Sequence, residues 1–190
     1  MSLIQKVQAV EEVFMHLDQE MGKFQAWSTL ACKLGCGKCC YKPDIEATVL
    51  EFLPFAHYLY DHDQAFDWLN KIQENQGNIC LIFEPTKTGA GSCSQYNYRG
   101  LICRLFGFSA RTDKYGQREL VTCQIIKAEQ AEAFAETVKK IQSGGSVPVM
   151  NHYYMRLHAI DGDLARDFYP INEAIKRAIE TVLHYYAYRN

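Results

Sequence analysis

The sequence lacks long hydrophobic runs and a strong net charge of either sign. No stretch approaches the roughly 20 apolar residues that a membrane-spanning helix needs, and the N-terminus has no apolar run of signal-peptide length. The formal net charge is only −2, so no overall field would attract nucleic acid or an anionic membrane. We therefore expect a cytoplasmic protein without a nucleic-acid or membrane partner.

Several signatures of catalysis and of multidomain chains are also missing. There is no glycine-rich phosphate loop and no serine-nucleophile elbow, and the 6 histidines are scattered without metal-ligand spacing. No internal repeat, low-complexity tract or linker interrupts the 190 residues. A chain of this length with 48% hydrophobic residues can bury one sizeable core, so we predict a single domain over residues 1–190.

Cysteine, by contrast, is abundant and concentrated. Four of the 8 cysteines follow one another in the pattern Cys-x3-Cys-x2-Cys-Cys, with lysines between and after them. Thiolate is the form that binds metal, and neighbouring positive charge favours it. In a reducing compartment such a set is more typical of metal ligands or redox groups than of disulfides, although the even number leaves disulfides open. The candidate ligands are Cys32, Cys36, Cys39, Cys40, Cys80, Cys93, Cys103 and Cys123.

Two redox or catalytic interpretations of the cluster are weaker. The spacing of Cys32, Cys36 and Cys39 matches the radical S-adenosylmethionine cluster, in which three thiolates leave one iron open. Cys36 and Cys39 also form the Cys-x-x-Cys of thiol–disulfide enzymes. A long predicted helix precedes the motif, and the alternating strand–helix pattern that supports either reading is missing. The additional thiols favour a metal site.

An apolar stripe before the cluster predicts one long amphipathic helix. Its members recur at alternating spacings of four and three residues, which brings them onto one helix face. We interpret this face as packing on the core rather than as a coiled-coil seam, because sustained flanking charge pairs are missing. Met15 and Met21 are then expected to fill the core. The stripe consists of Leu3, Val7, Val10, Phe14, Leu17, Met21 and Phe24.

Further helices and one strand are predicted on both sides of the candidate ligands. Residues 45–48 favour a short strand, and Thr48 with Glu51 has the form of a capping box that starts a helix, whose beginning Pro54 should shift or kink. A second helix follows up to Gly77. Later stripes predict helices over residues 131–141 and from Asn172 onward, with Asn172 as the N-cap.

Two short hairpins are predicted between these helices. An apolar run at 79–83 is followed by turn residues at 85–91 and by Cys93, and a second run at 106–123 turns near Gly116. The predicted fold class is therefore mainly α (α+β), a helical domain with two small β-hairpins around a cysteine-rich metal centre. That centre occupies about residues 32–123, and N- and C-terminal helices flank it.

Two arginines lie close to Cys103 in the sequence. Arg99 precedes it by four residues and would share its face if this piece is a short helix, and Arg104 follows directly. A four-thiolate zinc or iron–sulfur centre is anionic, so both arginines are candidate cofactor-binding residues that donate hydrogen bonds to the ligand sulfurs. The alternative is a solvated basic surface.

The whole pattern resembles the YkgJ-like cysteine-cluster family, a zinc- or iron-chelating domain. All eight cysteines match it, as do Tyr96, Arg99 and Arg104, whereas Gly100 stands where the family usually has proline. The resemblance covers about residues 32–123 and implies a metal site without a settled reaction. Some larger relatives are linked to flagellin lysine methylation.

Zinc is the predicted metal ion, with an iron–sulfur cluster as the alternative, because both take four thiolates. The chain is then a metal-binding protein. The alternative is an iron–sulfur enzyme or redox sensor, S-adenosylmethionine-linked or electron-transferring, and no protein partner is indicated. Because adjacent side chains usually diverge, Cys39 and Cys40 are expected to serve different centres. The expected groups are Cys32, Cys36, Cys39 and Cys103 at one centre, and Cys40, Cys80, Cys93 and Cys123 at a second centre or in a thiol-lined pocket.

Overall fold

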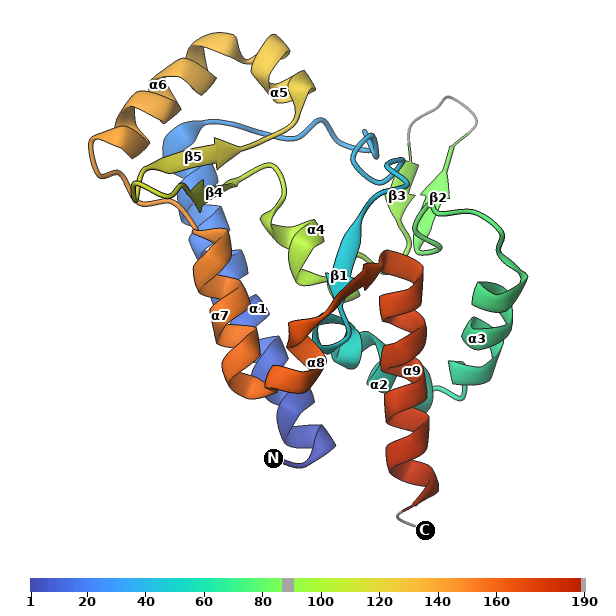
Figure 1. The fold of residues 1–190 in the computed structure, drawn as a ribbon. Helices are drawn as coiled ribbons and strands as arrows, with labels where there is room; N and C mark the ends of the chain where they lie inside the picture. The colour runs from blue at the N-terminus through green and yellow to red at the C-terminus, as the bar shows by residue number, and fades with distance from the viewer. Residues whose placement is uncertain (87–90, 189–190) are drawn as a thin grey trace. The chain divides into compact units, whose positions relative to one another are not determined.

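The computed structural model describes residues 1–86 and 91–188, which are mainly helical (Figure 1). Among these described residues, no helix has the length and apolar content that crossing a membrane requires. The helices are α1 (Leu3–Ser28), α2 (Leu53–Asp61), α3 (Ala65–Glu74), α4 (Leu101–Leu105), α5 (Gln124–Glu129), α6 (Ala131–Gln142), α7 (Met150–Ile160), α8 (Gly162–Arg166) and α9 (Ile171–Ala187), with 3-10 turns η1 (Leu50–Phe52) and η2 (Tyr96–Tyr98).

The strands form antiparallel pairs, of which two are the predicted hairpins. β2 pairs with β3 and β4 pairs with β5, which confirms the mainly α fold class with small hairpins. Part of the turn predicted at 85–91, residues 87–90, lies outside the described residues. A further pair, β1 with β6, was not predicted. The strands are β1 (Glu46–Thr48), β2 (Phe83–Pro85), β3 (Gly91–Cys93), β4 (Ser109–Thr112), β5 (Arg118–Val121) and β6 (Phe168–Pro170).

The contacts within the chain define two compact units. The first unit contains residues 1–12, 35–100 and 157–190, and the second contains residues 13–34 and 101–156. The cysteines are divided between them, with Cys32, Cys103 and Cys123 in the second unit and the other five in the first. The single domain over residues 1–190 stays a prediction.

The stripe along α1 is buried at every predicted position, from Leu3 to Phe24. Met21 is 8% exposed and fills the core as expected, but the expectation for Met15 was wrong because its side chain is 50% exposed. Met15 directly follows stripe residue Phe14, and each residue turns a helix by about 100°, so its side chain leaves the apolar face. Residue type alone was therefore a poor guide where helical position decides burial.

The core of the first unit lies between α2 and α9. One face of α9 is buried at Ile175, Ala178 and Ile179, and α2 contributes Phe55 and Leu59. Burying such apolar side chains contributes roughly 1.5–3 kcal/mol each for the larger ones. This packing holds the first unit together around the segments that carry Cys80 and Cys93.

The start of α2 agrees with the sequence prediction only in part, because Thr48 ends β1 and is not the N-cap of a helix. Val49 caps η1 and Phe52 caps α2. The Glu51 carboxylate accepts hydrogen bonds from the Thr48 backbone N–H at 2.7 Å and from its hydroxyl at 3.0 Å. The chain first makes the 3-10 turn η1, and α2 begins at Leu53 with Pro54 in its first turn, where no hydrogen-bonded N–H is needed. Pro54 thus shifts the start of the helix.

Asn172 is not the N-cap of α9, which is a correction to the sequence prediction. Pro170 occupies the N-cap with an extended ψ of 137°, and Asn172 lies inside the first turn. Its side chain accepts a hydrogen bond from the Leu81 backbone N–H at 3.0 Å and donates one to the Ile79 carbonyl at 2.9 Å. Asn172 therefore ties the chain on both sides of Cys80 to α9.

The second unit has its own hydrophobic cluster. It joins the end of α1 to the β4–β5 hairpin and to α5 and α6, and Trp27, Phe134 and Val138 pack against it. The predicted stripe on α6 thus faces this core. The buried members are Phe24, Leu30, Ala110, Leu120, Ile126, Ile141 and Val147.

Candidate metal centre

The loop that carries the clustered cysteines is bent by two glycines. Gly35 and Gly37 have φ values of 67° and 57°, in the left-handed region that other residues rarely adopt. The Cys40 N–H donates to the Gly37 carbonyl at 2.9 Å, and the Gly91 N–H at the start of β3 donates to the Gly35 carbonyl at 3.1 Å. The loop is thereby attached to the β2–β3 hairpin.

Phe83 of β2 packs against this loop. A Cβ atom at Gly37 would lie 2.6 Å from Phe83 Cε2 and 2.8 Å from the Gly91 carbonyl oxygen, so the backbones approach as closely as glycine allows. The Tyr41 ring meets the Phe83 ring edge-on with centroids 4.7 Å apart. Cys39 and Cys40 therefore stand on a loop whose backbone is held on both sides.

The Sγ atoms of Cys39 and Cys40 are 4.0 Å apart. Two thiolates on one tetrahedral zinc ion, each about 2.3 Å from the metal, have sulfurs roughly 3.8 Å apart. The premise that these adjacent side chains diverge is thus wrong in this loop, because the turn closed by Gly37 points both sulfurs the same way. A hydrogen bond from the Cys40 side chain lowers the pKa of Cys39 to about 6, which favours the metal-binding thiolate.

Cys80 and Cys93 are held next to each other by the first hairpin. Cys93 pairs with Phe83 across the ladder, and the Phe83 N–H donates to the Cys80 carbonyl at 3.0 Å. Burial raises the pKa of Cys80 to about 11, and the charge of a Cys93 thiolate acts in the same direction. Burial also raises the pKa of Cys93, which a hydrogen bond from the Gln95 backbone and the positive charge of Arg99 oppose. These thiolates therefore need nearby positive charge.

The two predicted arginines have different surroundings. Arg99 precedes α4 with an extended ψ of 142°, so it does not share a helical face with Cys103, and its guanidinium lies 3.9 Å from the Tyr96 ring centroid. Arg104 is buried, forms an ion pair with Asp18 and lies 4.6 Å from the Phe14 ring centroid. Of the two, Arg99 is the one whose charge acts on a cysteine of the first unit.

Gly100 is explained by its contacts in the first unit. A Cβ atom there would lie 2.8 Å from Phe52 Cζ and 2.9 Å from Glu51 Oε2. Both neighbours are buried, so neither can move away cheaply. Glycine is thus required at this position by the local packing.

Cys36 lies in the same loop of the first unit as Cys39 and Cys40, and the three other cysteines belong to the second unit. Cys32 is exposed, and a pair of hydrogen bonds between Gln130 and the Ala31 backbone fixes the chain beside it. Cys103 lies on α4, and Cys123 is the N-cap of α5, where its sulfur accepts from the Ile126 N–H at 3.4 Å. None of the eight cysteines forms a disulfide.

The structure thus brings together Cys39 with Cys40, and Cys80 with Cys93. Within residues 1–86 and 91–188, no group of three or more histidine, cysteine, aspartate or glutamate side chains has an arrangement that could hold a metal ion. The donor chemistry nevertheless fits zinc or iron, because the sulfur spacing of Cys39 and Cys40 is that of a chelating pair.

A protein-family model described as a putative zinc- or iron-chelating domain, CxxCxxCC, matches residues 31–137, more than half of the chain. The chain belongs to this family. Three residues separate its first two clustered cysteines, Cys32 and Cys36, whereas the family's name has two residues between them. Searches of curated proteins and of solved structures find no match.

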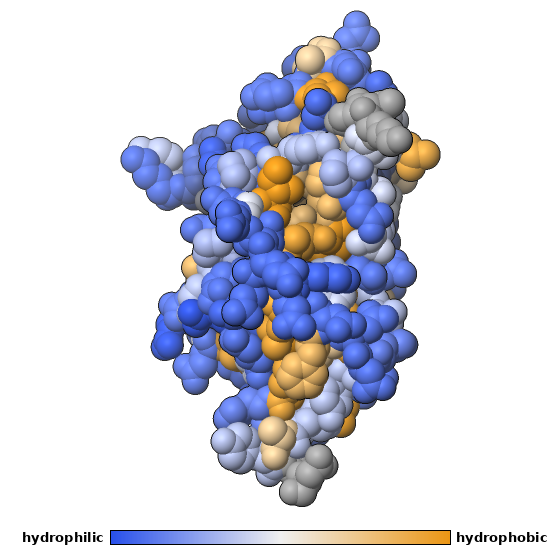
Figure 2. Space-filling model, turned by 90° about the vertical axis from the view of Figure 1, so that its right-hand side faces the viewer, coloured by the Kyte–Doolittle hydropathy of each residue, from blue (hydrophilic) through white to orange (hydrophobic). Residues whose placement is uncertain are grey.

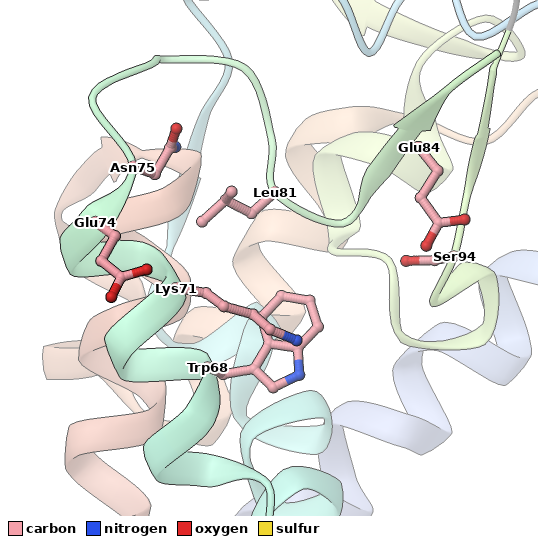
Figure 3. Close-up of a pocket in the computed structure, with 7 residues that line it drawn as sticks. All are labelled: Trp68, Lys71, Glu74, Asn75, Leu81, Glu84 and Ser94. Carbon is pink, nitrogen blue, oxygen red and sulfur yellow. The ribbon is translucent and has the colours of Figure 1, made fainter. Parts of the chain in front are cut away.

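This CxxCxxCC protein also has a pocket that was not predicted from its sequence. The pocket has a volume of about 340 Å³ and lies between α3 and the β2–β3 hairpin in the first unit (Figure 3). On the face that carries these elements, apolar side chains are exposed in a hollow surrounded by hydrophilic ones (Figure 2). The lining residues are Trp68, Lys71, Glu74, Asn75, Leu81, Glu84 and Ser94.

The pocket lies next to Cys80 and Cys93 in the chain. Leu81 follows Cys80 in the chain, and Ser94 follows Cys93. The sequence carries no signal for it, because Lys71 and Glu84 belong to separate elements and neither is part of a motif.

Proposed function

We propose that the chain binds zinc through its cysteines, and that Cys39 and Cys40 chelate the same ion. The 4.0 Å between their sulfurs supports this proposal and replaces the expectation that they serve different centres. Membership of a metal-chelating family supports the metal, and none of the eight cysteines is held in a disulfide, which leaves their thiols available as ligands. Because such thiols persist in a reducing compartment, we place the protein in the cytoplasm.

We propose Cys80 and Cys93 as a second pair of thiolate donors. Their buried thiols keep their protons in the absence of positive charge, and a divalent cation favours the thiolates far more strongly than one arginine does. Arg99 supports Cys93 electrostatically. Cys36 of the same unit, and Cys32, Cys103 and Cys123 of the second unit, are proposed as further metal ligands.

Exposure of the cluster supports one alternative, an iron–sulfur cluster with an accessible edge. Cys32 and Cys39 are both exposed, and solvent exposure is one of the factors that set the potential of such clusters. In that case the protein would be a redox sensor or an electron-transfer or S-adenosylmethionine-linked enzyme.

Anaerobic purification with elemental analysis and a visible absorption spectrum distinguishes these cases. We expect a colourless protein with zinc bound. Brown colour with acid-labile sulfide would establish the iron–sulfur alternative. A protein that binds neither metal after anaerobic reconstitution would contradict both.

Single substitutions test whether Cys39 and Cys40 share an ion. We expect Cys39→Ser and Cys40→Ser each to lose the same equivalent of zinc, and the double variant to lose no more than either. The matched control is Leu34→Ala in the same loop, because the Leu34 side chain is fully exposed and should not affect zinc content. Loss of two different equivalents, adding in the double variant, would refute the shared ion.

The arginines are tested by zinc affinity in a competition titration. We propose that Arg99 stabilises the metal-bound thiolate of Cys93, so Arg99→Met should weaken zinc binding by about 10-fold or more. Arg104→Met should act mainly on stability, because Arg104 already pairs with Asp18. Equal zinc affinity in Arg99→Met and the unaltered protein would contradict the role of Arg99.

A further inference from the structure

The pocket between α3 and the hairpin carries charges of both signs that are available to a ligand. Lys71, Glu74 and Glu84 line it, and in the part of the chain that the structure describes no ion pair joins any of them to another residue. The Lys71 ammonium instead lies 5.2 Å from the centroid of the Trp68 ring. A ligand with complementary charges would therefore not have to break an existing salt bridge.

The polar groups of the pocket accept more hydrogen bonds than they donate. The hydroxyl of Ser94 donates to the Ile82 carbonyl at 2.9 Å, which leaves its oxygen as an acceptor. The Asn75 amide is occupied by Gly77, to whose carbonyl it donates at 3.0 Å and from whose N–H it accepts at 3.1 Å. Two carboxylates and one hydroxyl thus line the pocket as acceptors, and the Lys71 ammonium and the Trp68 indole N–H line it as donors.

We propose that this pocket binds a small zwitterion with the ammonium and carboxylate groups of an α-amino acid. Glu84 and Ser94 lie side by side on the hairpin side of the pocket (Figure 3), where they can accept hydrogen bonds from an ammonium, and Lys71 matches a carboxylate. The volume of about 340 Å³ is at the small end of ligand pockets, which suits a molecule of this size. Leu81 and the Trp68 ring supply an apolar wall for its side chain, as Figure 3 shows.

The test compares L-leucine with two analogues that each lack one charge. N-acetyl-L-leucine has no ammonium, and L-leucinamide has no carboxylate. Binding to the full zinc-loaded chain is followed by the indole N–H resonances of its two tryptophans, Trp27 and Trp68, assigned with Trp27→Phe. We expect leucine to shift the Trp68 resonance alone, and each analogue to bind about 10-fold more weakly or worse.

Substitutions of two exposed pocket residues test which side chain binds the ammonium of leucine and which binds its carboxylate. Glu84→Gln should weaken the binding of leucine and leucinamide about 10-fold and leave that of N-acetyl-leucine unchanged. Lys71→Gln should weaken the binding of leucine and N-acetyl-leucine about 10-fold and leave that of leucinamide unchanged. The control is Glu132→Gln on α6, an exposed carboxylate outside the pocket. Equal binding of all three compounds, no Trp68 shift at millimolar leucine, or unchanged affinity in both variants would overturn the proposal. Because zinc content is measured separately, a negative result here leaves the proposed metal binding intact.

Discussion

Cys39 and Cys80 show how two thiols of one chain acquire opposite acidities. The pKa of Cys39 is lowered to about 6, chiefly because its neighbour Cys40 donates a hydrogen bond to the thiolate. Burial raises the pKa of Cys80 to about 11, because the surroundings disfavour the charged form. At neutral pH the metal-free protein therefore has one thiolate ready to bind and one thiol that must lose its proton on binding.

This difference predicts the alkylation rates of the metal-free protein. Because only the thiolate reacts, Cys39 should be alkylated faster than Cys80 at pH 7 and should slow down as the pH falls through about 6. Cys80 should stay slow until the pH approaches 11. Iodoacetamide pulses at several pH values, read by peptide mass spectrometry, measure both rates, and Cys40→Ala, which removes the hydrogen-bond donor, should slow Cys39 at pH 7. A Cys39 rate that keeps rising up to pH 9 would contradict the lowered pKa.

Gly37 is predicted to be the least replaceable glycine of the cysteine loop. Alanine there has to adopt a φ of 57°, at a cost of about 1–2 kcal/mol, and its Cβ would overlap Phe83, which adds roughly 1–3 kcal/mol. Gly116→Ala is the control, because Gly116 has a φ of 79° and nothing within 4 Å. Chemical denaturation should show a larger loss of unfolding free energy for Gly37→Ala, and equal losses would show that the contact with Phe83 is unimportant.

At the scale of elements, Asn172 acts as a clamp between α9 and the segment that carries Cys80. Asn172→Ala removes both hydrogen bonds to that segment and should lower the unfolding free energy by about 1 kcal/mol. Hydrogen exchange at the Leu81 N–H should accelerate. Asn151→Ala, at an exposed position of α7, should change neither quantity. Unchanged protection of Leu81 in Asn172→Ala would show that the clamp is not needed.

Elements with a local sequence signal were predictable, and those that depend on distant partners were not. The α1 stripe and the β4–β5 hairpin follow from periodicity and a nearby turn. β1 and β6 pair although about 120 residues separate them, and no local sequence pattern predicts that pairing. Asn172 was misassigned because a good capping residue type was placed after Pro170, which already occupies the N-cap.

The candidate site was predictable in composition but not in geometry. All eight cysteines stand out by number and spacing, yet the convergence of Cys39 and Cys40 depends on the left-handed conformation of Gly37, which residue type allows but does not require. The pocket charges Lys71 and Glu84 become neighbours only through the packing of α3 beside the hairpin. Tertiary contacts therefore decided what sequence patterns left open.

At the scale of the whole molecule, the two units differ in what holds them together near the cysteines. The second unit has a hydrophobic cluster that reaches from Phe24 to Val147. The cysteine loop has mostly exposed side chains, including a fully exposed Leu34, and buries little apolar surface of its own. The binding free energy of a metal therefore becomes folding free energy mainly in the loop and the hairpin beneath it.

Metal removal should accordingly destabilise the protein unevenly. A ligand present at about 1,000 times its dissociation constant contributes about 4 kcal/mol to stability, so chelation should lower the thermal midpoint clearly. Hydrogen exchange should then accelerate at residues 35–41 and in the β2–β3 hairpin, while amides around Leu120 and Ile141 keep more of their protection, because their core is built from apolar side chains and the proposed ligand Cys123 only packs against it. Leu34→Ala serves as a metal-retaining control. Uniform loss of protection would mean that metal stabilises one cooperative structure, and no loss in the loop would show that the loop folds without it.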